Sequence, residues 1–180
     1  HIRFSVGAGE VLGFLGPNGA GKSTTVKMLT GQLRPKAGSA TLLGMDIARQ
    51  PNQVQAQIGV AFEMANLYEQ MTAEENLNLF ARLFGVERFD AMALLERVGL
   101  GTRGKERVAG YSKGMKQRLM IARALVNQPR ILFLDEPTDG LDPVSAESIR
   151  NLIQQESAKG TTVFLTTHDM HEADKLSNRV

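Results

Sequence analysis

Hydrophobic residues along this chain gather into short runs that are separated by longer, regularly patterned segments. Runs dominated by apolar and β-branched residues are typical of strands buried on both faces of a sheet. Such runs occur at residues 11–15, 131–134 and 161–167, and shorter apolar segments predict further strands at 4–6, 40–43 and 58–62. The pattern therefore predicts a sheet with a buried centre.

Between these runs, apolar residues recur every three or four positions, which predicts helices with one buried face. Ser112 is a suitable N-cap for one of them, and Gly160 is a suitable C-cap for another. The first expected helix begins at Lys22 and is closed by Gly31 and Pro35. Further helices are expected within 72–98, from Ser112 through Asn127, and from Pro143 to Lys159.

The order of these elements predicts the fold class. Strands that alternate with helices form a parallel α/β sheet, whose ligands lie at the carboxyl ends of the strands. The middle of the chain is patterned as helix throughout. We therefore expect a single domain with a core of residues 1–62 and 130–180 and an inserted helical subdomain of residues 63–129.

Composition narrows the class without choosing a function. The chain has 180 residues, of which 42% are hydrophobic and 22% charged, ordinary values that exclude collagen-like and wholly disordered proteins. It has no cysteine, which excludes disulfides, thiol nucleophiles and cysteine-ligated zinc. It opens at His1 without an initiator methionine, so we expect a piece of a longer protein. No apolar stretch reaches membrane-spanning length, so we expect no bilayer span within these 180 residues.

Charge gives little indication of a nucleic-acid partner. Lysine and arginine number 21 against 19 acidic residues, a net charge of +2. Basic residues do cluster at Arg103, Lys105, Arg107, Lys113, Lys116 and Arg118. A solvated face and a surface that meets an anion or a partner both remain open for this cluster.

The sequence after the first buried run predicts a phosphate-binding loop. Residues 16–23 fit G-x-x-x-x-G-K-[ST] and stand between an expected strand and an expected helix. Glycines let backbone N–H groups surround phosphate oxygens, Lys22 supplies a positive charge, and the Ser23 hydroxyl is a ligand for Mg²⁺. An ordinary glycine-rich turn would match by chance in about one per cent of such chains. The expected binding residues are Gly16, Pro17, Asn18, Gly19, Ala20, Gly21, Lys22, Ser23 and Thr24.

Two other strand ends carry polar side chains. Asp135 and Glu136 follow a buried strand, where consecutive residues point in different directions. We expect Asp135 to hold Mg²⁺ and Glu136 to take a proton from water, although an ordinary acidic strand end is the alternative. His168 is expected to contact a terminal phosphate. A structural histidine and a zinc site with His171 are its alternatives.

Together these motifs resemble the nucleotide-binding domain of ATP-binding cassette (ABC) proteins, over essentially the whole chain. Residues 111–118, Tyr-Ser-Lys-Gly-Met-Lys-Gln-Arg, stand where that family has its LSGGQ signature and a following Gln-Arg pair. Residues 140–142 resemble its D-loop, and residues 167–169 resemble its switch-histidine loop. The resemblance implies an α/β fold with a P-loop NTPase (RecA-like) parallel sheet core and a helical insertion.

The resemblance also implies an ATPase that works as a pair. Two such domains pack head to tail around ATP and Mg²⁺, so that the signature of one faces the phosphate loop of the other. Here that implies catalytic roles for Lys22, Glu136 and His168. The residues expected to act in trans are Ser112, Lys113, Gly114 and Met115, with Asp142 in the D-loop.

This chain departs from the family pattern at two places. Lys113 and Met115 replace a glycine and a glutamine of the signature, a version that resembles ATP-binding subunits of ABC-2 type exporters. Glu63 stands where the family has its Q-loop glutamine, so an oxygen is kept for Mg²⁺ or water while the amide donor is lost. We count Glu63 with Ser23 and Asp135 as a candidate metal residue.

The sequence thus predicts a Mg²⁺-dependent ATPase module that powers export across a membrane. Its expected partners are a second ABC domain and a transmembrane permease, at the cytoplasmic face of the cell membrane, and no nucleic acid is expected. Two alternatives stay open. One is a soluble ABC ATPase that acts on ribosomes or DNA, and the other is a degenerate cassette that binds nucleotide without turnover.

Overall fold

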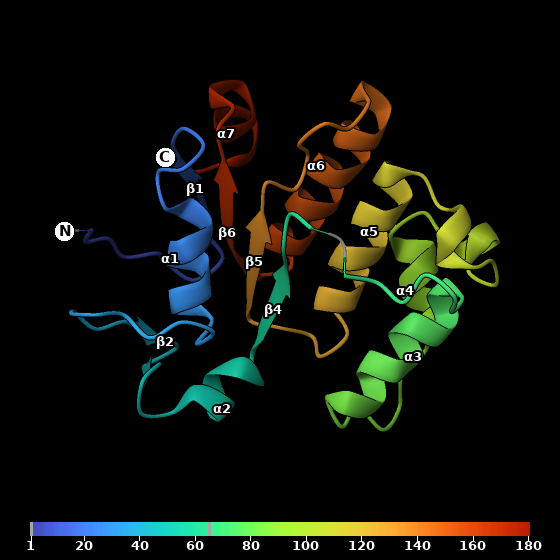
Figure 1. Cartoon of the computed structure of the whole chain (residues 1–180), viewed down its shortest axis with the longest axis horizontal. Helices are drawn as coiled ribbons and strands as arrows, with labels where there is room; N and C mark the ends of the chain where they lie inside the picture. Colours follow the sequence, from blue (N-terminus) through green and yellow to red (C-terminus); the bar gives the residue numbers. More distant parts are fainter. Residues whose placement is uncertain (1, 65) are drawn as a thin grey trace.

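A four-stranded parallel sheet forms the centre of the protein, in the computed structural model that describes residues 2–64 and 66–180 (Figure 1). The strand order is β1-β6-β5-β4, so strands far apart in sequence are neighbours. The carboxyl ends of β1, β6 and β5 therefore meet at one edge. The strands are β1 (Val11–Leu15), β4 (Ile58–Ala61), β5 (Ile131–Asp135) and β6 (Thr162–Thr167).

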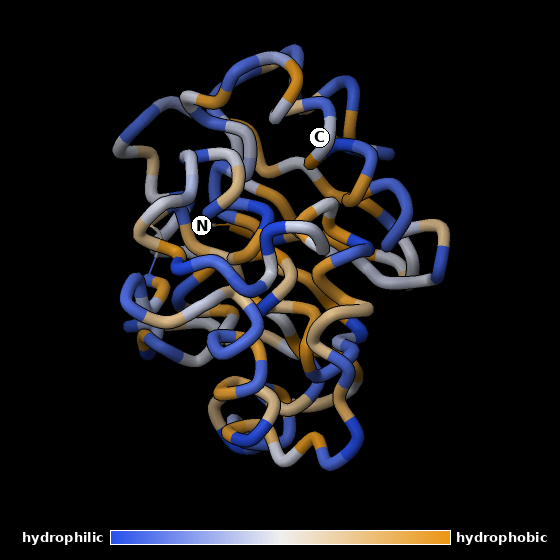
Figure 2. Tube along the Cα trace, turned by 90° about the vertical axis from the view of Figure 1, so that its right-hand side faces the viewer, coloured by the Kyte–Doolittle hydropathy of each residue, from blue (hydrophilic) through white to orange (hydrophobic). Residues whose placement is uncertain are grey.

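Helices cover both faces of this sheet, because its strands are apolar on both sides. One face presents Leu12, Phe133 and Phe164 to Val26 of α1 (Lys22–Leu29). On the same side lie the short helix α2 (Pro51–Gln55) and the hairpin of β2 (Thr41–Leu42) and β3 (Met45–Asp46). The other face packs against α6 (Pro143–Ala158) and α7 (Met170–Leu176). Figure 2 shows the hydrophobic segments gathered in the interior, with hydrophilic loops around them.

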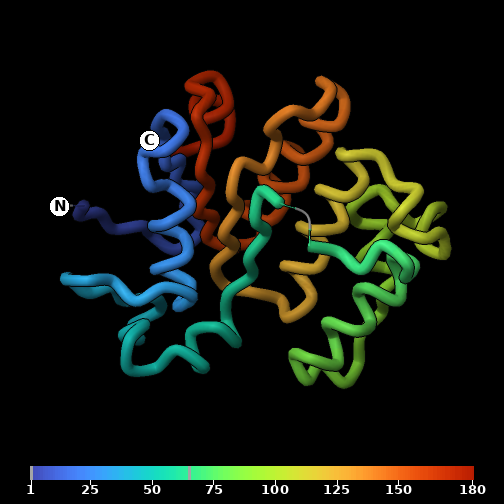
Figure 3. Tube along the Cα trace, in the orientation of Figure 1, coloured from blue at the N-terminus to red at the C-terminus, as the bar shows by residue number. Residues whose placement is uncertain are grey.

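The chain leaves the sheet after β4, forms a group of helices, and returns at β5 (Figure 3). Thr72 begins the first of them with a capping box, since its hydroxyl accepts from Glu75 N and the Glu75 carboxylate accepts from Thr72 N. Asp90 and Ser112 cap the next two α-helices. The elements are α3 (Ala73–Leu83), α4 (Ala91–Arg97), the 3₁₀ turns η1 (Gly101–Arg103) and η2 (Val108–Gly110), and α5 (Lys113–Ala124).

The helical group shares one hydrophobic core with the sheet. Leu77 of α3 and Leu95 of α4 belong to the same buried cluster as Leu132 and Leu134 of β5. The last residue of α5 packs directly on β4, where a Cβ at Gly59 would lie 2.0 Å from the Ala124 carbonyl oxygen. The helix that carries the signature is thus anchored to the sheet, and the division at residues 63 and 129 stays a prediction.

The structure differs from the sequence predictions at three places. Residues 2–7 run as irregular backbone instead of a strand, and Phe4 packs on the rings of Phe14 and Phe164, 5.9 and 5.7 Å away. The expected strand at 40–43 forms a two-residue hairpin arm, because the chain reverses through positive φ angles at Leu43 and Gly44. The helical pattern expected over 72–98 forms two helices with a break that the pattern did not place, after Leu83, where Gly85 turns the chain with a φ of 70°.

Candidate functional site

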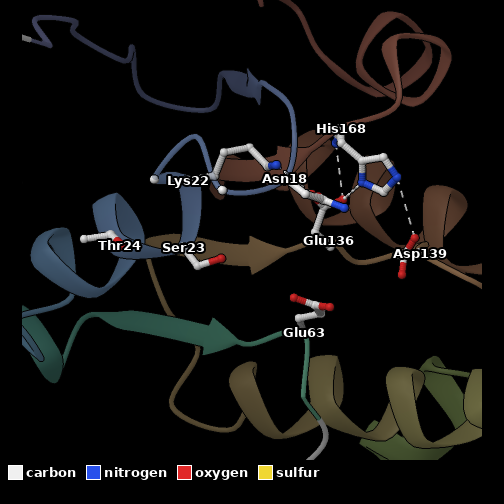
Figure 4. Close-up of a pocket in the computed structure, with 10 residues that line it drawn as sticks. Asn18, Lys22, Ser23, Thr24, Glu63, Glu136, Asp139 and His168 are labelled. Atoms are coloured by element: carbon white, nitrogen blue, oxygen red, sulfur yellow. Dashed lines mark hydrogen bonds and ion pairs between the residues drawn. The ribbon is translucent and has the colours of Figure 1, made fainter.

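Predicted site residues from three strand ends line one cavity of about 400 Å³, whereas Gly16, Pro17, Ala20 and Asp135 lie outside its wall (Figure 4). The phosphate loop follows β1, Glu136 follows β5, and His168 follows β6, so the sheet edge brings them together. Glu63, which lies two residues beyond β4, completes the opposite side. The wall consists of Asn18, Gly19, Gly21, Lys22, Ser23, Thr24, Glu63, Glu136, Asp139 and His168.

The phosphate loop has the geometry of an anion cradle. Gly19 and Gly21 have φ angles of 81° and 92°, in the left-handed region that favours glycine. Helix α1 begins directly afterwards at Lys22, and Gly21 has no side chain with which to cap it. The first N–H groups of α1 therefore lack a capping side chain at Gly21, and the helix dipole favours negative charge at this end.

Lys22 is folded back over the loop. Its side chain is buried, and its Nζ donates hydrogen bonds to the carbonyl oxygens of Gly16 at 2.7 Å and Pro17 at 3.2 Å. The same Nζ lies 3.1 Å from Glu136 Oε1. An ammonium group has three donors, and three protein oxygens surround this one. A phosphate oxygen in the cavity would compete with Glu136 for the third N–H donor of this ammonium group.

Glu136 is held in an unusual backbone conformation. Its φ is 50°, in the left-handed region, and its N–H donates to the carbonyl oxygen of Thr166 at 3.1 Å. Within the described part of the chain, Glu136 Oε1 is buried and accepts no hydrogen bond of good geometry, although Lys22 lies beside it. Once the ammonium moves to another anion, this oxygen has no other partner among the described residues.

His168 contacts the other oxygen of the same carboxylate. Its Nδ1 lies 3.0 Å from Glu136 Oε2, and its backbone N–H donates to that oxygen at 3.3 Å. A carboxylate only accepts, so the contact places the proton on Nδ1. Nε2 is then turned toward Asp139, 3.9 Å away (Figure 4). His171, the second ligand of the alternative zinc site, lies outside the cavity wall.

Asp135 has different surroundings from its neighbour, as the alternation along a strand predicts. It is buried, it lies outside the cavity wall, and its carboxylate accepts a hydrogen bond from the Thr166 hydroxyl. Asp135 and Phe133 share one side of the strand, the side that α1 covers. Ser23, at the start of α1, and Glu63, after β4, both point into the cavity (Figure 4).

The donor set fits Mg²⁺. The hydroxyl of Ser23 and the carboxylates of Glu63 and Asp135 are hard oxygen ligands, and Mg²⁺ takes one or two protein carboxylates together with phosphate and water oxygens. Ser23 and Glu63 share the cavity wall with the cradle of Gly19 and Gly21, which fits the phosphates that would complete such a shell, whereas Asp135 lies outside that wall.

Two residues at the site were missed by the sequence reasoning. Asp139 lines the cavity, and Thr166 binds both Asp135 and the backbone of Glu136. Thr166 of β6 stands two positions before His168. Because side chains alternate along a strand, this spacing already indicated that Thr166 lies on the same side of the strand as His168. Asp139 lies in the loop after β5, and nothing in its local pattern pointed to the cavity.

The residues expected to act in trans lie together outside this cavity, at the start of α5 and α6. The Ser112 hydroxyl accepts from Met115 N at 3.3 Å and caps α5. A Cβ at Gly114 would meet Ser145 Oγ at 2.4 Å, and one at Gly140 would meet Lys113 Nζ at 2.4 Å. The signature and the D-loop, which ends at Asp142, are thus packed against each other.

Comparisons with known proteins agree with this arrangement. The family model described as ABC transporter matches residues 1–139. The chain is 50% identical over 179 residues to the fluoroquinolones export ATP-binding protein of Mycobacterium tuberculosis, covering 99% of this chain and 60% of that protein. It is 45% identical over 180 residues to the daunorubicin resistance ATP-binding protein DrrA2 of Streptomyces coeruleorubidus, covering 98% of this chain and 56% of that one. The chain therefore spans less than two thirds of these relatives.

A solved structure shows the same fold. It is a dimeric post-hydrolysis state of an ATP-binding cassette bound to ADP and Pi, and it superposes with a TM-score of 0.85 at 27% identity. The superposition covers 98% of this chain and 85% of that one. The P-loop NTPase fold predicted from the sequence is thereby confirmed.

Proposed function

This chain belongs to the ABC transporter family, and on that premise we propose that it binds ATP with Mg²⁺ and hydrolyses it. The observation that carries the proposal is the convergence of Lys22, Glu136 and His168 beside the glycine cradle, where one buried oxygen of Glu136 has Lys22 as its single close partner among the described residues. Its curated relatives carry ATP-binding in their names, which supports ATP as the nucleotide.

The triphosphate is assigned to residues 16–24. Backbone N–H groups of the loop and of the start of α1 face its oxygens, and Lys22 exchanges its contact with Glu136 for a phosphate oxygen. Ser23, Asp135 and Glu63 are the residues that would hold Mg²⁺, which neutralises phosphate charge when bound. The exchange at Lys22 frees Glu136 for chemistry only when phosphate is present.

Hydrolysis is assigned to Glu136 as general base. Its Oε1 accepts a proton from a water molecule, the water oxygen attacks the γ-phosphorus, and the bond to the β–γ bridging oxygen breaks, giving ADP and inorganic phosphate. His168 orients the carboxylate through Nδ1, and its Nε2 side faces the cavity next to Asp139. The low exposure of Lys22 and Glu136 strengthens the electrostatic contacts that position the reactants.

The cassette is proposed to work as a head-to-tail pair. Ser112 and Lys113 are exposed at the start of α5, where a helix N-terminus and a lysine present positive charge, and Gly114 and Met115 follow them in the first turn. We assign them to the γ-phosphate of a partner cassette, with Asp142 of the D-loop beside them. The dimeric state of the similar cassette bound to ADP and Pi supports the pairing itself.

Closure of such a pair is proposed to drive an exporter. Two relatives are named for fluoroquinolone export and for daunorubicin resistance. Among the described residues, no helix combines the length and apolar character that a bilayer span requires. From the names of these relatives we propose a transmembrane permease domain as partner, at the cytoplasmic face of the cell membrane.

The Glu136→Gln variant of the full-length protein tests the enzymatic part of this proposal. Glutamine keeps the shape of the side chain but cannot take a proton from water, so ATP binding should persist while turnover falls by about 10²- to 10⁴-fold. Isothermal titration calorimetry with and without Mg²⁺ measures binding, and phosphate release measures turnover. Retained turnover in the variant would reassign the base.

The wild-type protein in the same assays separates the alternatives. A wild-type protein that binds ATP without releasing phosphate would be a degenerate cassette. One that hydrolyses ATP but copurifies with ribosomes or DNA and with no membrane protein would be the soluble class. Absence of Mg²⁺-dependent binding to any nucleoside triphosphate would contradict the whole proposal.

A further inference from the structure

A buried carboxylate ties three segments of the core together. Glu172 on α7 is 8% exposed and accepts hydrogen bonds from Arg150 of α6, at 3.0 Å from Nε and 2.5 Å from Nη2. Its other oxygen accepts a hydrogen bond from the Thr138 hydroxyl at 3.0 Å. Thr138 lies in the loop between β5 and α6. One side chain therefore joins that loop to both helices.

The network supplies fixed geometry more than it supplies stability. A buried ionised carboxylate is costly unless it is paired, and a two-point contact with arginine satisfies it in one plane. The hydrogen bond to Glu172 is the main cause that raises the pKa of Arg150 above its usual value. Apolar residues of similar volume often stabilise a core as well as such a pair does. What apolar packing would not reproduce is the directional bond to Thr138.

The two segments joined by Glu172 are the ones that meet in the cavity. Thr138 stands two residues after Glu136, and α7 begins two residues after His168. Glu136 and His168 touch within the cavity, whereas Thr138 and Glu172 lie outside its wall. The same two segments are thus connected twice, once at the site and once at a buried point beside it.

The loop after β5 needs such a connection. Glu136 adopts a φ of 50°, which is unfavourable for a residue with a Cβ and persists only when the surrounding contacts fix it. Thr166 holds the loop on the strand side of Glu136, and Thr138 holds it on the helix side. The His168 ring is 40% exposed, so packing alone does not hold it against Glu136.

We propose that Glu172, held by Arg150, is a positioning residue that binds Thr138 and thereby maintains the contact between Glu136 and His168 that hydrolysis requires. This inference rests on the proposed ATPase function. The network contacts neither the phosphate loop nor the candidate Mg²⁺ residues, so its loss should lower turnover and leave nucleotide affinity unchanged.

Variants of Thr138 in the full-length protein test the proposal. Thr138→Val removes the hydroxyl at nearly constant volume, and kcat should fall by about 10- to 100-fold, as expected for a misplaced catalytic group. The dissociation constant of ATP should stay within about twofold, and Thr138→Ser should restore kcat. Glu172→Leu, which removes every hydrogen-bonding atom of this side chain, should reproduce the loss. Glu147→Gln is the control, because it removes the charge of the exposed second partner of Arg150, 2.5 Å away, and leaves the bond to Thr138.

Nuclear magnetic resonance of the His168 ring gives a second readout that does not depend on turnover. Its ¹H–¹³C signals, assigned from a His168→Gln variant, should move in Thr138→Val and stay in place in Glu147→Gln. Unchanged signals with wild-type kcat in Thr138→Val would overturn the proposal, as would an equal loss of kcat in Glu147→Gln or a loss explained by weaker ATP binding. If the wild-type protein hydrolyses no ATP, the proposed function fails, and the His168 signals still decide the positioning role.

Discussion

The carboxylate of Glu136 lies between Lys22 and His168, and each of its two oxygens contacts one of them. Lys22 lies 3.1 Å from one carboxylate oxygen of Glu136, and His168 lies 3.0 Å from the other. A bound phosphate would compete with Glu136 for this ammonium, so the contact that holds the carboxylate on its Lys22 side would change when substrate is present.

Glu63 is the residue at this site whose chemistry departs most from the family pattern. Its carboxylate lines the cavity where the family has a neutral amide. A negative oxygen binds Mg²⁺ more strongly than an amide oxygen does, because Mg²⁺ is a hard cation. The site of this chain should therefore depend on Glu63 for its metal affinity.

We predict that Glu63→Gln in the full-length protein raises the Mg²⁺ concentration for half-maximal ATPase activity by about tenfold, the lower end of the effects seen around metal sites. A Mg²⁺ titration of phosphate release measures it. Glu87→Gln is the control, because Glu87 is exposed and lies outside the cavity wall. An unchanged titration in Glu63→Gln would remove Glu63 from the metal site.

At the scale of elements, the position of α5 depends on one close contact with the sheet. The carbonyl oxygen of Ala124 lies where a Cβ of Gly59 would stand. Below this point Asn127 donates to the carbonyl oxygens of Ala56 and Ile58, at 3.1 Å each. Glycine in β4 therefore sets the distance between the sheet and the helix that begins with the signature.

We predict that Gly59→Ala lowers the free energy of unfolding by about 1–3 kcal/mol, because the added methyl group forces α5 away from β4. Chemical denaturation followed by circular dichroism measures the loss. Gly110→Ala is the matched control, since within the described residues a Cβ there would meet no atom within 4 Å and its φ is not positive. Equal stabilities for the two variants would show that the contact at Gly59 relaxes without cost.

At the scale of the whole molecule, the cavity and the signature form two separate surfaces. The cavity lies at the carboxyl edge of the sheet, and the exposed Ser112 caps α5 elsewhere. A single chain thus offers an anion cradle and a second positive helix terminus that do not meet. A head-to-tail pair would bring each cradle to the other signature, which makes association depend on the bound nucleotide.

We predict that the full-length Glu136→Gln protein is monomeric alone and dimeric with ATP and Mg²⁺, as measured by sedimentation velocity. Ser112→Asp in the same background should keep the helix cap but place negative charge before the partner's γ-phosphate. This second variant should bind ATP as a single chain and remain monomeric. Dimerisation that ignores nucleotide, or that survives Ser112→Asp, would contradict pairing through the signature.

The sequence by itself determined the parts of this protein that depend on local geometry. A buried strand followed by G-x-x-x-x-G-K-[ST] and a helix predicts the cradle, and parallel strands bring Glu136 and His168 to the same edge as Lys22. These inferences need only the period of each element and the rule that parallel strands end together. The family resemblance rests on the same local motifs.

Only the tertiary structure decided which side chains meet across long separations. The register of β5 with β6 places Thr166 opposite Asp135, and the path of α7 places Glu172 against Thr138. Local pattern likewise predicted a strand at residues 4–6, where the chain instead packs Phe4 on Phe14 and Phe164. Register and packing are set by the free energy of the whole core, so no window of sequence contains them.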